Sequence, residues 1–285
     1  MQRSTIDAVR RTAIAAAVCL SAACGGGSGG SGVTGPIPTP PRTDTVPSFA
    51  GFDIGVYPGD AAMHAWVHPA SPYYWAGYYL PAPCHRDTTW SNKYAAVTSM
   101  GWGVAALYVG QQDFSQMSAS AARAEQAGQE LVTCSSTLLT TTQGTDEATD
   151  AVTKMRADGF PDRSVIFLDV EPVTTVTPAL LQYYHAWIAG VLHDGRYRPG
   201  VYAAKANAPT LYAAALEDFR AAGSTDVPFF WIAASGNFSL TSPPTAVGLD
   251  YAKLWQGMFN VTQTWNGVSL NIDADVAWSK SPSAP

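Results

Sequence analysis

The segment Ser164-Val-Ile-Phe-Leu-Asp169-Val-Glu171-Pro172 decides how this 285-residue chain is interpreted. Residues 165–168 form a short apolar, partly β-branched run that Pro172 closes, as expected of a buried strand. Side chains alternate along a strand, so Asp169 and Glu171 project from one face at its carboxyl end. Two neighbouring carboxyl groups acquire separated pKa values, and one stays protonated near neutral pH. Such a pair suits glycoside hydrolysis, although it also fits acids that cap a helix or pair with an arginine.

Short apolar segments alternate with helical segments around this strand. Strands are predicted at residues 49–54, 73–80, 103–109, 165–170, 200–204, 229–233, 252–256 and 271–273, with a doubtful one at 131–133. Helices are predicted at residues 145–158, 178–193 and 209–222, the first stopped by Gly159 and the second opened by Pro178. About eight strands with helices between them predict an α/β fold, a single (β/α)8 TIM-barrel-like domain.

In such a barrel the functional side chains lie at the carboxyl ends of the strands. Several predicted strands end in a polar or aromatic residue, namely Asp53, Tyr79, Gln111, Asp169 with Glu171, Tyr202, Trp231, Gln256 and Asp273. A helix cap explains Asp53 alone and a core amide explains Gln256 alone, but their recurrence at one end predicts a shared site. Sugar rings stack on aromatic faces, although most tryptophans are core. The predicted substrate-binding residues are Tyr79, Gln111, Tyr202, Trp231, Trp255 and Gln256.

The N-terminal residues 1–23 are typical of a lipoprotein signal peptide. Arg10 and Arg11 precede an apolar run at residues 12–20 that is too short to span a bilayer, and small residues lead to Cys24. Cys24 is the predicted lipidated N-terminus, and an ordinary export signal cut nearby is the alternative. A flexible tether rich in Gly, Ser and Pro is predicted at residues 24–47, the barrel at 48–280 and a C-terminal tail at 281–285.

The cysteines, the net charge and the histidine spacing restrict the partners and cofactors that we expect. Cys84 and Cys134 are predicted to form a disulfide, as a cysteine pair in an exported protein usually does. The net charge is −6 and no basic patch is visible, which argues against nucleic acid and leaves only a lipid anchor for membrane contact. The histidines match no zinc-site spacing, so neither a metal nor another cofactor is expected. The barrel is expected to be a monomer.

Three motifs carry a family resemblance. Gly51-Phe-Asp53, Tyr108-Val-Gly-Gln111 and Ile166-Phe-Leu-Asp169-Val-Glu171 resemble domain of unknown function family 1906, a glycoside-hydrolase-like domain of exported bacterial proteins. Later segments at residues 200–202, 230–233, 254–256 and 272–275 fit that family as well. The resemblance spans residues 48–280 and extends to the muramidases of glycoside hydrolase family 25, which share a barrel fold.

The resemblance implies roles for four acidic residues. Glu171 matches the general acid, Asp169 the carboxylate beside it, Asp53 the first-strand carboxylate and Asp273 the last-strand one, with Asp275 as an alternative alignment. The implied function is hydrolysis of a β-glycosidic bond in an N-acetylated glycan of the cell envelope, such as peptidoglycan, at a lipid-anchored membrane surface. A non-catalytic glycan-binding module with the same cleft is the main alternative. A metal-dependent hydrolase is a third, and retention versus inversion stays open.

Overall fold

The computed structural model describes residues 47–119, 122 and 133–285. The expected signal peptide, Cys24 and nearly all of the tether lie outside the described residues, as does most of the doubtful strand at 131–133. Residues 46–285 form one compact unit. Within the described part of the chain, no helix is both long and apolar enough to cross a membrane.

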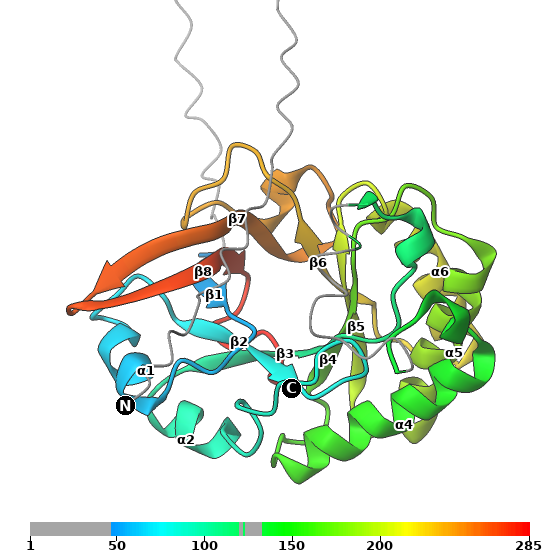
Figure 1. Ribbon diagram of the computed structural model, residues 1–285, viewed down its shortest axis with the longest axis horizontal. Helices are drawn as coiled ribbons and strands as arrows, with labels where there is room; N and C mark the ends of the chain where they lie inside the picture. Colours follow the sequence, from blue (N-terminus) through cyan, green and yellow to red (C-terminus); the bar gives the residue numbers. More distant parts are fainter. Residues whose placement is uncertain (1–46, 120–121, 123–132) are drawn as a thin grey trace, which may run out of the picture. The chain divides into compact units, whose positions relative to one another are not determined.

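Eight strands close into a barrel in the order of the sequence (Figure 1). They are β1 (Phe49–Asp53), β2 (Trp75–Leu80), β3 (Gly103–Tyr108), β4 (Val165–Val170), β5 (Arg198–Ala204), β6 (Phe229–Ala233), β7 (Ala252–Trp265) and β8 (Val268–Ala277). Strands β1 to β7 pair in parallel, which confirms the predicted eight-stranded barrel. Strand β8 is antiparallel to both β7 and β1, because the tight Asn266-Gly267 turn joins β7 to β8 directly.

Helices cover the outside of the first six strands. They are α1 (Asp60–Trp66), α2 (Tyr94–Ser99), α4 (Thr141–Ala157), α5 (Pro178–Asp194) and α6 (Ala208–Ala221), with short 3-10 helices η1 (Phe114–Gln116), η2 (Ser136–Leu138) and η3 (Pro244–Val247). The start of α5 follows from its sequence. The Thr177 hydroxyl accepts a hydrogen bond from the Leu180 N–H as the N-cap, and Pro178 occupies the first turn. Between β6 and β7, where every residue is described, the connection contains η3 in place of an α-helix.

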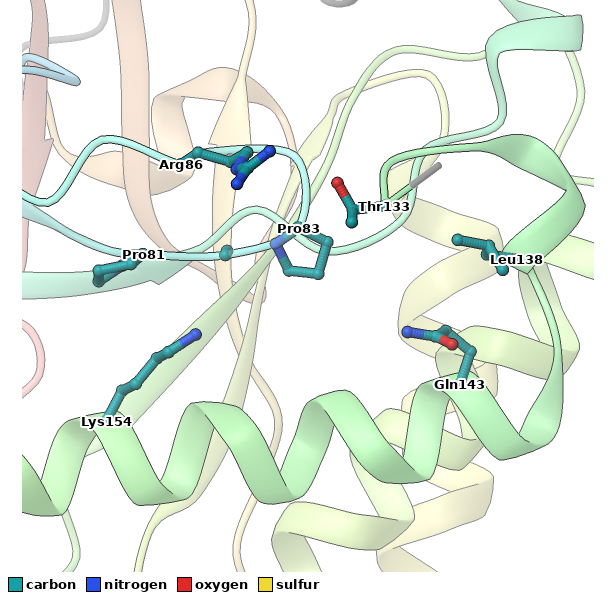
Figure 2. A pocket seen from close by; sticks show the side chains of 8 residues that line it. Pro81, Pro83, Arg86, Thr133, Leu138, Gln143 and Lys154 are labelled. Carbon is teal, nitrogen blue, oxygen red and sulfur yellow. The ribbon is translucent and has the colours of Figure 1, made fainter. Parts of the chain in front are cut away.

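A disulfide joins Cys84 to Cys134, as predicted. It links the loop after β2 to the segment before α4. A hollow of about 460 Å³ lies between that loop and α4 (Figure 2) and is lined by Pro81, Ala82, Pro83, Arg86, Thr133, Leu138, Gln143 and Lys154. None of the predicted site residues lines this hollow, which is therefore separate from the predicted site.

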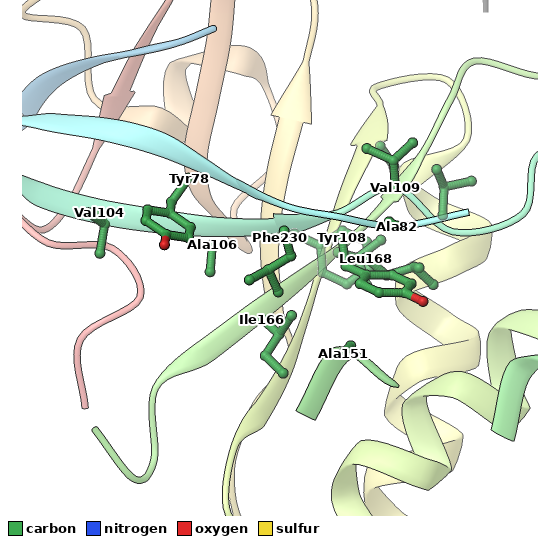
Figure 3. Close-up of a cluster of buried hydrophobic side chains, with 14 of the residues drawn as sticks. Tyr78, Ala82, Val104, Ala106, Tyr108, Val109, Ala151, Ile166, Leu168 and Phe230 are labelled. Carbon is green, nitrogen blue, oxygen red and sulfur yellow. The ribbon is translucent and has the colours of Figure 1, made fainter. Parts of the chain in front are cut away.

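Two apolar layers stabilise the barrel. The outward faces of the strands pack beneath the helices, as Figure 3 shows for Ile166 and Leu168 of β4 and Ala151 of α4. The inside is filled by a second set of side chains, which includes Trp75, Leu107, Val165, Phe167, Trp231 and Leu254. Because this inner layer is apolar, any polar group at the end of the barrel rests on a floor that solvates charge poorly.

The C-terminal residues pack against the barrel. The Ser283 hydroxyl donates to the Val165 carbonyl oxygen and accepts from the Ala106 N–H, and the Ser283 N–H donates to the Val104 carbonyl. Ser283 is buried. The packed chain therefore extends beyond the boundary expected near Lys280.

Candidate active site

Acidic side chains from three strands gather at one end of the barrel. Asp53 is the last residue of β1, Asp169 lies near the end of β4, and Glu171 directly follows that strand. Strand β8 runs the other way, so its middle residue Asp273 pairs in register with Asp53. Asp275 follows two residues later and faces the same interior side. The alternatives Asp273 and Asp275 thus both point into the barrel.

Gln256 of β7 connects two of these carboxylates. Its amide nitrogen donates to Asp53 Oδ2 at 2.7 Å and to Asp273 Oδ2 at 3.0 Å, while its oxygen accepts from the Tyr202 hydroxyl. The Tyr79 hydroxyl donates to Asp53 Oδ1 at 2.6 Å. Both Asp53 oxygens are therefore held by neutral donors, and the Gln256 amide is fully engaged within the protein.

Asp275 lies beneath this pair and is completely buried. The Trp231 indole N–H donates to Asp275 Oδ1 at 3.0 Å. Burial first, and then the charges of Asp53 and Asp273, raise the pKa of Asp275 well above its ordinary value. These effects favour the protonated form of the Asp275 carboxyl group.

The neighbouring acids also bind protons more tightly than usual. Burial and the charge of Asp273 raise the pKa of Asp53 to about 7, against the opposing effect of the hydrogen bonds from Tyr79 and Gln256. Burial likewise raises the pKa of Asp273, which the Asn260 N–H partly offsets. The β1–β8 side of the site consequently exchanges protons near neutral pH.

The β4 side is organised through its backbone. The buried Gln112 side chain donates from Nε2 to the Asp169 carbonyl oxygen at 2.8 Å and accepts the Glu171 N–H on Oε1 at 3.0 Å. This pair of hydrogen bonds fixes the chain where it leaves β4. Asp169 is 5% exposed, whereas Glu171 is half-buried at the rim.

Tyr202 shows that the two sides form one site. Tyr202 of β5 pairs in register with Asp169 of β4, and its hydroxyl donates to the Gln256 amide oxygen. Burial raises the pKa of Tyr202, and the charges of Glu171, Asp169, Asp53 and Asp273 raise it further. Because charges act on a group only when they are close, the acids predicted on three separate strands lie around one tyrosine.

Two other predicted side chains, Gln111 and Trp255, lie away from these acids, whereas Trp231 lies beneath them and donates to Asp275. Gln111 is buried between the Thr133 carbonyl, the Ser135 N–H and Glu147 of α4. Trp231 has no exposed surface and forms part of the barrel floor. Trp255 faces outward, where its indole N–H donates to the Ala234 carbonyl. Gln111 and Trp255 thus belong to the structure of the barrel, and Tyr79, Tyr202 and Trp231 are the predicted aromatic residues that lie at the acidic cluster.

Two residues of the site were not predicted from the sequence. Gln112 immediately follows Gln111, and no motif distinguishes the inward-facing glutamine from the outward one. The His85 ring lies 4.9 Å from the Tyr79 ring, centroid to centroid, and burial lowers its pKa, so it lines the site as a neutral ring. Among the described residues, no cluster of His, Cys, Asp and Glu is arranged to hold a metal ion.

Comparison with known families identifies one match. The sequence model of the Rv2525c-like, glycoside hydrolase-like domain matches residues 64–277, which include Asp169, Glu171 and Asp273. No curated protein sequence matches the chain.

Solved structures share the fold at low sequence identity. An uncharacterized protein from B. stearothermophilus superposes with a TM-score of 0.52 at 16% identity, over 80% of this chain and 95% of the other. The modular autolysin LytC from Streptococcus pneumoniae gives a TM-score of 0.52 at 12% identity, and LytC in complex with a synthetic peptidoglycan ligand gives 0.51 at 12%. Both LytC matches cover 80% of this chain and 46% of LytC, so this chain spans about half the length of the autolysin.

Proposed function

The chain belongs to the Rv2525c-like glycoside hydrolase-like domain family, and from this premise we propose that it hydrolyses β-glycosidic bonds in an N-acetylated glycan of the bacterial cell envelope. The barrel resembles that of LytC, an autolysin with a structure in complex with a peptidoglycan ligand. Peptidoglycan is accordingly the first substrate to test.

The observation that carries the proposal is geometric: Gln256 links Asp53, Asp273 and Tyr202, and Tyr202 pairs with Asp169, two residues before Glu171. Glycoside hydrolysis needs one carboxylic acid to protonate the leaving oxygen and one carboxylate to stabilise or attack the sugar carbon. Carboxyl groups crowded over an apolar floor are driven to different protonation states, which supplies both forms at one pH. A set of this size exceeds what capping one helix or pairing one arginine requires.

The geometry supports a distinct role for each acid. Glu171 lies at the rim, so we assign it the proton transfer to the leaving oxygen. Asp169, next to it on the same strand, stabilises positive charge on the sugar ring or orients the substrate acetamido group. Asp53 and Asp273, joined by Gln256, position the sugar or water and keep Glu171 protonated.

We also propose that the domain acts outside the cytoplasm. The N-terminal residues 1–23 are proposed to direct export, Cys24 to carry a lipid, and the segment up to residue 47 to tether the barrel to a membrane surface. A single acyl chain binds membranes only reversibly, so anchoring depends on more than one chain at Cys24. Mass spectrometry of the N-terminal peptide from membrane fractions checks this assignment: a lipidated Cys24 supports it, and an unmodified N-terminus elsewhere contradicts it.

Replacing the proposed acid tests the reaction directly. Glu171→Gln should lower the release of reducing sugar from purified sacculi by about 10²- to 10⁴-fold, the usual contribution of a general acid. The matched control is Glu217→Gln on the exposed face of α6, which should equal wild type. Equal release by Glu171→Gln and wild type contradicts the assignment of the acid.

A glycan-binding module without turnover is the second candidate. It is favoured by the hydrogen bonds to Asp53 and Asp273, because both acids are already engaged by Gln256. In that case wild type and Glu171→Gln both retain sacculi in a pull-down, and neither releases reducing sugar or changes the mass of chitooligosaccharides.

A further inference from the structure

The strands β7 and β8 continue well past the barrel as a two-stranded arm, which we define as residues 258–272. Figure 1 shows this hairpin projecting beyond the other strands. Its strands pair from Val261 with Ile272 to Trp265 with Val268, after two register shifts near Met258. β-Bulges of this kind redirect a strand, and here they lie beside the acids.

One face of the arm is covered by the rest of the protein. The side chains of Val261, Trp265, Val268 and Leu270 pack against the apolar core. The indole N–H of Trp66 in α1 donates to the Val268 carbonyl oxygen at 3.0 Å. This face therefore fixes the arm to the barrel.

The other face is exposed and polar. It carries Thr262, Thr264, Ser269 and Asn271, all exposed to solvent. The pairs are Thr262 with Asn271 and Thr264 with Ser269, so the four side chains form a compact patch. The Asn271 amide donates to Thr262 Oγ1 at 3.3 Å, and the hydroxyls of Thr264 and Ser269 are 2.7 Å apart. We call these four residues the polar face.

The polar face is continuous with the site. Alternate residues of one strand share a face, and in β8 that series runs from Ala277 through Asp275 and Asp273 to Asn271 and Ser269. The first two of these contribute to the interior of the barrel, and Asp273 binds Gln256 there. From Asp273 to Ser269 the strand extends by about 13 Å, which is longer than one sugar ring.

The chemistry of the arm indicates a neutral ligand. No Asp, Glu, Lys or Arg occurs from Gly257 through Ile272. Hydroxyl and carboxamide groups can each donate and accept hydrogen bonds, as can the hydroxyl and acetamido groups of a sugar polymer. Phe259 lies at the base of the arm. Its apolar ring is 39% exposed.

We propose that the polar face extends the glycan-binding surface and binds the sugar residues that continue beyond those at the acids. The occupant is a long neutral N-acetylated polysaccharide, so this inference rests on the ligand class of the proposed function. The arm gives the protein a preference for polymer over short oligosaccharides. Hydrogen bonds between a protein and a sugar are individually weak, so several in a row are needed to produce this preference.

The test compares affinity for long and short glycans. The arm variant combines Thr262→Val, Thr264→Val, Ser269→Ala and Asn271→Ala, which remove the polar groups and keep residues suited to a strand. Both proteins carry Glu171→Gln, so that glycans stay intact, and calorimetry measures binding of chitobiose and of long chitooligosaccharides. The ratio of long-chain to chitobiose affinity should fall by about tenfold in the arm variant.

Controls separate the possible outcomes. Thr149→Val with Thr153→Val removes two exposed hydroxyls from α4 and should leave the ratio unchanged. A smaller variant, Thr264→Val with Ser269→Ala at the outer end of the arm, gives a partial fall if the full variant folds poorly. An unchanged ratio overturns the inference, as does an arm variant that alters only the oligomeric state seen by light scattering.

The proposed hydrolysis can fail independently of the arm. If wild type binds long glycans through the arm but releases no reducing sugar, the proposed role of the arm is supported and the proposed hydrolysis is contradicted. If wild type cleaves sacculi while the arm variant keeps the wild-type ratio of long-chain to chitobiose affinity, the proposed hydrolysis is supported and the proposed role of the arm is contradicted. Failure to bind either glycan overturns both.

Discussion

The two sides of the acidic site are built in different ways, and each depends on one buried glutamine. On the β1–β8 side, Gln256 binds the carboxylate oxygens of Asp53 and Asp273 directly. On the β4 side, Gln112 binds the backbone around Asp169 and Glu171 and leaves the positioning of the side chains to the strand. One side is fixed through its charged groups and the other through its main chain.

The two sides differ in how they avoid the free-energy cost of burying charge. On the β1–β8 side, an apolar floor raises the pKa of three acids, which reduce their charge by holding protons. On the β4 side, Glu171 is half-buried and part of its surface stays in contact with solvent. A buried side that binds protons and a more exposed acid on the other side are what the proposed acid catalysis requires.

The largest expected effect is a pH dependence of stability that originates on the β1–β8 side. Asp53 has a folded pKa of about 7 against an ordinary value of 3.8, so between these values the folded protein binds more protons than the unfolded chain. This stabilisation is complete below the unfolded pKa and is lost as the pH rises through the folded one. The free energy of unfolding should therefore fall between pH 4 and 7, by an amount on the order of 4 kcal/mol from Asp53.

Urea unfolding curves at several pH values measure this slope. Asp53→Asn removes the titrating group and should flatten the fall. Asp146→Asn, on the exposed face of α4, is the matched control and should retain the wild-type slope. If the unfolding free energy of Asp53→Asn falls with pH as steeply as that of wild type, the pH dependence comes from groups other than Asp53.

The next effect is the loss of the bridge between the carboxylates. Gln256→Leu leaves Asp53 Oδ2 and Asp273 Oδ2 without their shared donor and the Tyr202 hydroxyl without its acceptor. Buried polar groups that lose their partners cost about 1–3 kcal/mol each, so we expect destabilisation of about 3 kcal/mol at pH 7. Thermal denaturation measures it, with Gln143→Leu as the control, since that amide donates to Glu147 from a less buried position. An equal loss of stability in both variants would show that Gln256 contributes no more than a less buried amide does.

Much of the fold could be predicted because strong local patterns coincide with it. Residues 165–170 and 229–233 are apolar runs that the structure contains as β4 and β6 with the predicted bounds. The order of the strands then followed from the alternation with helices. The acidic residues could be predicted for the same reason, since each lies at or near a strand end.

The arm and Gln112 were not predicted, whereas Gln256 was. Strands β7 and β8 were expected at residues 252–256 and 271–273, but they extend to Trp265 and begin at Val268. Their outer parts alternate polar and apolar residues around Asn266-Gly267, a local hairpin signal from which the arm could have been predicted. Gln111 and Gln112 are adjacent in the sequence, and the turn of the backbone after β3 decides which of them faces the acids.

The smallest expected effect tests that last distinction. Gln112→Leu removes both hydrogen bonds that hold the chain at Asp169 and Glu171, so the acid should be less well placed in the transition state. We expect kcat on sacculi to fall by about tenfold, with KM little changed, and stability to fall by about 1 kcal/mol. Gln112 thus acts as a positioning residue through the backbone of Glu171.

The adjacent glutamine provides the control for this prediction. Gln111→Leu also removes buried hydrogen bonds, to Thr133, Ser135 and Glu147, and should lower stability at least as much while kcat stays near wild type. Loss of stability alone would affect both variants alike, so only a difference in kcat reports positioning. If Gln111→Leu lowers kcat and Gln112→Leu does not, the outward glutamine serves the substrate, as the sequence suggested. The comparison between a side fixed by its charges and a side fixed by its backbone would then fail, because the β4 side would not depend on the bond that defines it.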